Sequence, residues 1–134
     1  MERNQVLMLT PETTVRAAAR RMAESGTGAA MVVRDDVLLG IFTERDALFR
    51  VIARDLDPAS VRLDNVMTTD PRTVGPDDTY GYALVMMNEG GFRHAPVVEN
   101  GKPIGIVSSR NAMDPDMEEF ASEANRREHL MRHR

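Results

Sequence analysis

At 134 residues the chain has the length of one ordinary domain, and a composition that is 42% hydrophobic and 28% charged is typical of a globular protein. A formal net charge of −4 offers no overall excess of cations for a phosphate backbone, so we expect no nucleic-acid partner. Cysteine is absent from the sequence, which excludes disulfide bonds, thiolate catalysis and cysteine-ligated metal or iron–sulfur sites.

The apolar segments of the chain are short. Residues 29–33, one of the longest, fall far below the length that spans a bilayer. The first five residues lack the basic and apolar regions of a signal peptide. We therefore expect a soluble, cytoplasmic protein with no membrane partner.

An internal repeat organises the sequence. A shift of 65 positions superposes residues 11–48 on residues 76–113 without a gap, and 13 of the 38 positions are identical. Unrelated segments of ordinary composition would share roughly two or three. Both copies are therefore expected to fold in the same way. The identical pairs are Pro11/Pro76, Thr14/Thr79, Ala18/Ala83, Met22/Met87, Glu24/Glu89, Gly26/Gly91, Ala30/Ala95, Val32/Val97, Val33/Val98, Gly40/Gly105, Ile41/Ile106, Arg45/Arg110 and Ala47/Ala112.

The first copy predicts a strand, a helix, two strands and a second helix, in that order. Thr13 and Thr14 supply oxygens that cap the first helix, and Gly26 ends it. A tight turn at residues 34–36 joins the two later strands into a hairpin. The expected bounds of the five elements are 7–9, 15–25, 29–33, 38–42 and 43–54.

The second copy repeats this order after a polar turn at 55–60 and a short helical lead-in at 61–67. Its hairpin contains Asn100-Gly101, a strong signal for a type I′ turn. The first copy has no counterpart of the lead-in, because the alignment reaches Met1 first. The expected elements are strands at 73–74, 95–98 and 103–107, and helices at 80–90 and from Ser108. A final helix is expected from Asp114, with Pro115 at its first position. We therefore divide the chain into repeat 1 (1–54), linker and lead-in helix (55–65), repeat 2 (66–113) and C-terminal helix (114–134).

Four linked motifs resemble the CBS-domain tandem, or Bateman module. Residues 40–46 (Gly-Ile-Phe-Thr-Glu-Arg-Asp) and 105–111 (Gly-Ile-Val-Ser-Ser-Arg-Asn) close the two copies. Residues 66–71 look like the opening of such a repeat and residues 91–98 like its middle. The resemblance covers about residues 5–113. It implies an α/β (α+β) fold of two tandem βαββα repeats related by a pseudo-twofold axis, with two clefts.

The same resemblance implies a regulatory function. Modules of this family sense AMP, ADP, ATP, S-adenosylmethionine or NAD(H) and usually form a homodimer. We therefore expect an adenine nucleotide or S-adenosylmethionine as a regulatory ligand, with no required cofactor and no metal. The regulated partner protein is unknown.

Thr43 and Asp46 are the first candidate ligand-binding residues, because they stand where a buried strand becomes a helix. A carboxylate one turn into the helix can accept both hydroxyls of a ribose, each bond contributing about 1.5–3 kcal/mol. The Thr43 hydroxyl and the free N–H groups of the helix start suit a phosphate. The alternative is purely structural: Thr-x-x-Asp is also a capping box, in which Asp46 bonds back to the backbone. The second copy has Ser108 and Asn111 at these positions, so its site should be weaker or empty.

Arg93 and His94 are the second candidates, since their counterparts in the first copy are Gly28 and Ala29. Both stand just before a buried strand and could point into a cleft toward phosphates, unless they are an exposed loop arginine and a half-buried histidine. The remaining candidates are Ile41 and Phe42, which could line an adenine pocket or belong to the core, and Arg45 and Arg110, for which solvent-facing helix positions are the simpler interpretation.

Two functions from different classes follow. We favour a nucleotide-sensing module that transmits ligand binding to a dimer or partner surface. The alternative is a structural dimerisation or partner-docking module with degenerate, ligand-free clefts. Catalysis is not expected, because the sequence has no nucleophile elbow, P-loop, Rossmann glycine run or H-E-x-x-H motif. His129 and His133 stand four residues apart on the last helix, where a solvated basic helix end is favoured over a metal site.

Overall fold

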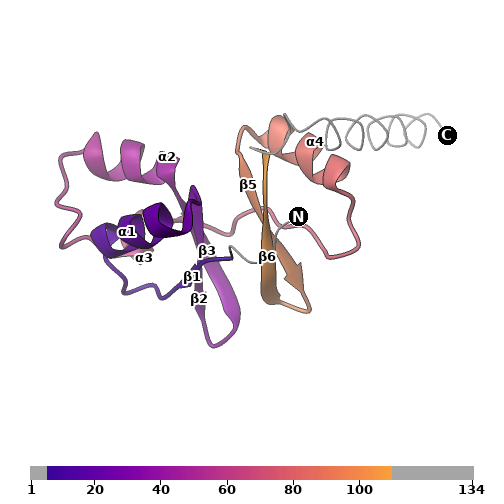
Figure 1. Ribbon diagram of the computed structural model, residues 1–134, viewed down its shortest axis with the longest axis horizontal. Helices are drawn as coiled ribbons and strands as arrows, with labels where there is room; N and C mark the ends of the chain where they lie inside the picture. Colours follow the sequence, from indigo (N-terminus) through magenta and orange to yellow (C-terminus); the bar gives the residue numbers. More distant parts are fainter. Residues whose placement is uncertain (1–5, 110–134) are drawn as a thin grey trace.

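The computed structural model describes residues 6–109, which form two lobes side by side, one from each copy of the repeat (Figure 1). The tandem α+β architecture predicted from the sequence is confirmed. The predicted C-terminal helix at 114–134, and most of the second helix of the second copy, lie outside the described residues.

The elements of the first lobe are β1 (Met8–Leu9), α1 (Val15–Ser25), β2 (Ala29–Arg34), β3 (Val37–Thr43), α2 (Glu44–Asp46) and η2 (Ala47–Ile52), which is a π-helix. We extend the name lead-in from the predicted residues 61–67 to residues 61–69, which contain α3 (Leu63–Val66) and β4 (Thr68–Thr69). The second lobe contains α4 (Tyr80–Gly90), β5 (His94–Glu99) and β6 (Lys102–Ser108). Each predicted strand and first helix is therefore present within a residue or two of its expected bounds, Val74 forming a single bridge rather than a strand.

The two sheets share one arrangement. In the first lobe the strand order is β1-β2-β3-β4, with β1 parallel to β2 and the other pairs antiparallel. In the second lobe β5 and β6 form an antiparallel pair. Leu9 pairs in parallel with Val32, and Val74 makes the same parallel bridge to Val97, 65 positions later. The duplication is thus visible in the strand register.

Local sequence explains the turns and the helix ends. Asn100 and Gly101 have φ of 52° and 81°, and Asp35 and Asp36 have 52° and 63°, as the two central residues of a type I′ turn require. The Thr14 hydroxyl accepts the Ala17 N–H at 3.2 Å and caps α1. These turns and caps were predicted from the sequence, and the structure confirms them.

The second helix of the first lobe differs from the prediction of one regular helix over 43–54. It has a single short α-helical turn. The backbone of η2 then forms hydrogen bonds between residues five positions apart, such as the one from the Ala53 N–H to the Leu48 carbonyl at 2.9 Å. Asp46 and Val51 are both buried. In an α-helix two residues five positions apart face different sides, whereas the wider π-turn turns them inward together.

Each lobe has its own aliphatic core. The first core contains residues of α1, β2 and β3, together with Leu63, Val66 and Met67 of the lead-in. The second core is built from Val74 and residues of α4, β5 and β6. The lobes meet where β3 lies near β6 (Figure 1). Within residues 6–109 no helix combines the length and the apolar character needed to cross a membrane.

Candidate functional site

A cleft of about 950 Å³ lies between the two lobes. One wall comes from the end of β3 with α2 and η2, and the other from the segment that enters β5. The lead-in completes it through β4 and the loop that follows. The lining residues are 41, 43–46, 48–50, 68, 70–72 and 91–94.

This cleft brings together six of the ten residues that were predicted to bind a ligand. They are Ile41, Thr43, Arg45, Asp46, Arg93 and His94. The two pairs of candidates, 43/46 and 93/94, come from different lobes and are separated by almost 50 residues. Their convergence on one cavity depends on the tertiary fold, and neither motif predicts it by itself.

Thr43 and Asp46 form the predicted capping box. The Thr43 hydroxyl accepts the Asp46 N–H at 3.2 Å, and Asp46 Oδ2 accepts the Thr43 N–H at 3.0 Å. The structural interpretation of this motif is therefore correct, although it leaves ligand binding open. Asp46 is only 6% exposed, yet it still borders the cleft.

Residues outside the motif also hold the Asp46 carboxylate. Thr68 of β4 donates its hydroxyl to Oδ1 at 3.2 Å, and the Arg50 Nε lies 3.6 Å from the same oxygen. Arg50 in turn donates to the Met67 carbonyl at 2.9 Å. A carboxylate oxygen has two lone pairs, so Oδ1 has capacity for a further donor. The acid is oriented by its neighbours with one oxygen still able to accept.

Arg45 links the two lobes across the cleft. Its Nη1 donates to the Gly91 carbonyl at 3.5 Å, and its guanidinium lies 5.3 Å from the centre of the Phe49 ring. The side chain is exposed, as expected, and it also borders the cleft.

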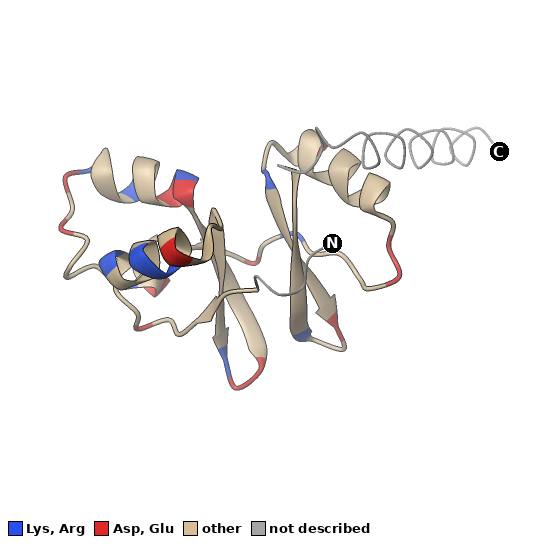
Figure 2. Ribbon diagram, viewed as in Figure 1, with Lys and Arg blue, Asp and Glu red and all other residues tan. Residues whose placement is uncertain are grey.

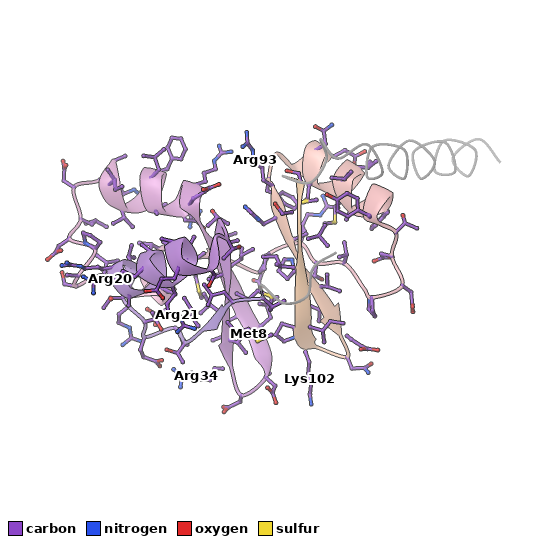
Figure 3. The ribbon with its side chains drawn as sticks, viewed as in Figure 1. Met8, Arg20, Arg21, Arg34, Arg93 and Lys102 are labelled. Carbon is purple, nitrogen blue, oxygen red and sulfur yellow. The ribbon has the colours of Figure 1, made fainter. Side chains whose placement is uncertain are left out.

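Arg93 and His94 stand on the opposite wall, at the start of β5. Arg93 is exposed and lies between the two lobes in Figure 3. His94 is buried more deeply than the half-buried position considered from the sequence, because it is paired with Ser108 inside the β5–β6 ladder. The Arg93 carbonyl accepts the Ser109 N–H at 3.0 Å, which holds this segment in place.

Two predicted site residues do not line the cleft. Phe42 is fully buried in the first core, because successive side chains of a strand point to opposite faces and Ile41 faces the cleft. Ser108 is half-buried and borders no part of the cleft, and its carbonyl accepts the Tyr80 hydroxyl at 2.7 Å. Burial raises the pKa of that phenol above its ordinary value. Arg110 and Asn111 lie outside the described residues.

Sequence reasoning missed Arg50, Thr68 and Arg72, which also border the cleft. Arg50 follows Asp46 by four residues, the spacing of an ion pair on a helix, and this signal could have been used. Thr68 belongs to the opening motif of the second repeat, but nothing local shows that it reaches Asp46.

The charge of the lining favours an anionic occupant only slightly. The lining contains four arginines (45, 50, 72 and 93) and three carboxylates (Glu44, Asp46 and Asp70). The Arg50–Asp46 ion pair neutralises one charge of each sign. Among residues 6–109 no three acidic or histidine side chains are grouped in a way that would hold a metal ion.

Comparison with known proteins identifies the repeat. A family model described as CBS domain matches the chain twice, over residues 1–53 and 63–115. A CBS domain-containing protein of Arabidopsis thaliana is 38% identical over 104 residues, which is 77% of this chain but only 19% of that protein. The chain thus spans about a fifth of that relative.

Solved structures agree with the fold. A putative signal-transduction protein with CBS domains from Burkholderia ambifaria has a TM-score of 0.77 at 32% identity, over 84% of this chain and 83% of that one. A CBS domain protein from Pyrobaculum aerophilum, solved in complex with AMP, has a TM-score of 0.79 at 24% identity, over 88% and 92% of the two chains.

Proposed function

The chain belongs to the CBS domain family, and from that premise we propose that it is a regulatory module that binds an adenosyl nucleotide in the cleft between its two repeats. The observation that carries the proposal is the meeting of the Thr43–Asp46 and Arg93–His94 pairs on one cavity. A relative of the same fold, in complex with AMP, supports the choice of ligand class.

We propose a role in binding for the lining residues that would face each part of such a ligand. Asp46 Oδ1 accepts a ribose hydroxyl beside the Thr68 hydroxyl that already holds it. Ile41 provides an apolar contact for the base, and Arg93 and Arg72 provide charge for phosphates. Because Arg45 already joins the lobes through Gly91, a ligand in the cleft acts on the contact between them. The ligand shifts the lobes from one arrangement to another only if it binds the two arrangements with different affinities.

A thermal-shift and calorimetry series with AMP, ADP, ATP, S-adenosylmethionine and NADH tests the proposal. A ligand at a hundredfold excess over its Kd should stabilise the protein by about 2.7 kcal/mol. Arg93→Gln changes an exposed side chain and should weaken phosphate-bearing ligands about tenfold, the equivalent of roughly 1.4 kcal/mol. Arg20→Gln, on exposed α1, is the matched control and should bind as wild type does (Figure 3). No shift with any of the five, or equal loss in both variants, would refute the assignment.

The second candidate function is a structural dimerisation module, and a specific surface favours it. Leu48, Phe49 and Ile52 on η2 are 51%, 57% and 63% exposed, and Leu56 follows them at 40%. Such a row of large apolar side chains is typical of an interface rather than of solvent-facing surface. We propose that this surface forms a homodimer; two of its residues, Leu48 and Phe49, also border the cleft.

A further inference from the structure

Two phenylalanines border the cleft, one from each lobe. Phe49 belongs to η2, and Phe92 lies in the loop between α4 and β5. The third phenylalanine of residues 6–109, Phe42, is buried in the first core. The guanidinium of Arg45 lies 5.3 Å from the centre of the Phe49 ring, whereas no cation of the described residues lies over the Phe92 ring. Phe92 therefore provides an aromatic surface at the cleft that no arginine covers.

The Phe92 ring packs directly on Gly90. A Cβ added at Gly90 would overlap the ring, with Cδ1 at 2.7 Å and Cζ at 3.2 Å. Gly90 is the last residue of α4 and is not one of the glycines with a positive φ. Its backbone conformation is therefore open to any residue, and the space taken by the ring is what excludes a side chain at this position.

The first repeat has a different pair of residues at these two positions, Ser25 and Thr27. The backbone between them turns in the same way in both repeats, with φ of 67° at Gly26 and 73° at Gly91. Thr27 bonds to its own loop, its hydroxyl donating to the Ala29 carbonyl at 3.2 Å. The glycine and the aromatic ring thus occur together in the second repeat, although the fold of the loop requires neither of them.

The wall to which the ring belongs is apolar. Phe92 is half-buried and packs against the second core. The helix α4 that precedes it contains one charged residue, Glu89, whereas α1 contains four, and Figure 2 shows this difference. The core and Gly90 therefore hold the ring in place while part of it borders the cleft.

The neighbours of Phe92 place it among the proposed ligand contacts. Its carboxyl-side neighbour Arg93 is an exposed cation that borders the cleft, and the carbonyl of Gly91 on its other side accepts the Arg45 Nη1 at 3.5 Å. Ile41 adds an apolar contact from the first lobe. A planar base that lies on the Phe92 ring would therefore have a phosphate contact in the next residue of the chain and an apolar contact from the other lobe.

We propose that Phe92 determines recognition of the base: the planar base stacks on its ring, and Gly90 positions that ring at the cleft. Removal of an aromatic side chain that stacks on a base weakens binding by about fivefold to about 150-fold. Phe92 contacts the ligand, whereas Gly90 acts only through Phe92. This inference rests on the proposed function, because it concerns the same cleft and the same class of ligand.

AMP is the probe, and calorimetry with the full-length chain measures its affinity. Phe92→Ala should weaken AMP at least about fivefold, and Gly90→Ala should do the same because the new methyl group displaces the ring. Ser25→Ala, at the equivalent helix end of the first repeat, is the matched control and should bind AMP as wild type does. Ribose 5-phosphate has no base, so the Phe92 and Gly90 variants should bind it as wild type does, whereas Arg93→Gln should bind both compounds more weakly.

NMR of the bound nucleotide provides a second measurement. The ring current of Phe92 should move the adenine H2 and H8 resonances upfield, and Phe92→Leu, which keeps an apolar side chain against the core, should remove that upfield shift. Equal AMP affinity of wild type and Phe92→Ala, or equal adenine shifts in wild type and Phe92→Leu, would overturn the inference. An equal loss of affinity for AMP and for ribose 5-phosphate would also overturn it, since Phe92 would then have a purely structural role.

The two proposals fail in different ways. AMP binding that is independent of Phe92 would refute the role of this residue and leave the proposed function intact. A wild-type chain that binds none of the five nucleotides would refute the proposed function and this inference together.

Discussion

A methyl group added at Gly40 is expected to destabilise the fold because β4 approaches β3 at that residue. The new Cβ would stand 2.7 Å from the Thr68 carbonyl oxygen, a backbone atom that cannot turn away, and 2.8 Å from the Met67 sulfur. Overpacking of this kind costs about 1–3 kcal/mol. Widening the Gly40–Thr69 pair adds about 1 kcal/mol for a weakened strand hydrogen bond.

Gly105 provides the matched substitution at the same position of the other repeat. Its added Cβ would be at an ordinary 3.8 Å from Val97. Replacing glycine by alanine also stabilises the fold by about 0.4–1 kcal/mol, because it lowers the conformational entropy of the unfolded chain. This gain applies to both variants. The net expectation is a loss of about 2–3 kcal/mol for Gly40→Ala and a change within about 1 kcal/mol for Gly105→Ala.

Urea unfolding followed by circular dichroism measures the difference. With m near 1–3 kcal/mol/M, the midpoint of Gly40→Ala should fall by about 1 M or more while that of Gly105→Ala stays close to wild type. Equal midpoints for the two variants, or a lower one for Gly105→Ala, would refute the conclusion that, within residues 6–109, the lead-in closes on β3 at Gly40 while Gly105 of β6 meets no such contact.

Three further outcomes are expected. Asp46→Ala removes the acceptor of the Thr43 N–H and of the Thr68 hydroxyl, so the protein without ligand should lose about 1–3 kcal/mol in urea unfolding; an unchanged midpoint would contradict the capping box. Ile52→Glu should convert a dimer to a monomer in sedimentation analysis while changing monomer stability by no more than about 0.5 kcal/mol, and a dimer that survives it would exclude this surface. Burial raises the pKa of the Tyr80 phenol, so the contribution of this group to the free energy of unfolding is fully present below the ordinary pKa of 10.0 and is lost as pH rises through the higher folded value. Above pH 10.0 the Tyr80→Phe variant should therefore lose less stability than wild type does. Parallel curves of stability against pH for the two proteins would contradict this.

Much of the fold could be predicted from the sequence because its signals are local or repeated. The Asn100-Gly101 turn, the threonine caps and the helix-ending glycines depend on neighbouring residues, and the duplication required each signal to appear twice. The π-helix could not be predicted in this way. The π-helix turns both Asp46 and Val51 inward, and their burial depends on tertiary packing within the first lobe.

The sequence predicted several of the residues that border the cleft, but not the contacts between them. Thr43, Asp46, Arg93 and His94 were found as short motifs, and all four border the cleft. Phe42 was left open between an adenine pocket and the core, and it lies in the core, because the face of a strand that points inward depends on which neighbour covers it. The Thr68–Asp46 bond joins residues 22 positions apart, a separation that no periodicity reports.

The lead-in follows the first repeat in the chain, and its motif marks the beginning of the second repeat. Its side chains nevertheless complete the core of the first lobe. A fragment cut after residue 54 would leave behind Leu63, Val66 and Met67, and with them the strand that borders β3. Dissection of this protein into halves therefore has a natural boundary after Thr69, and the amino-terminal half made that way would contain every described residue of its own core.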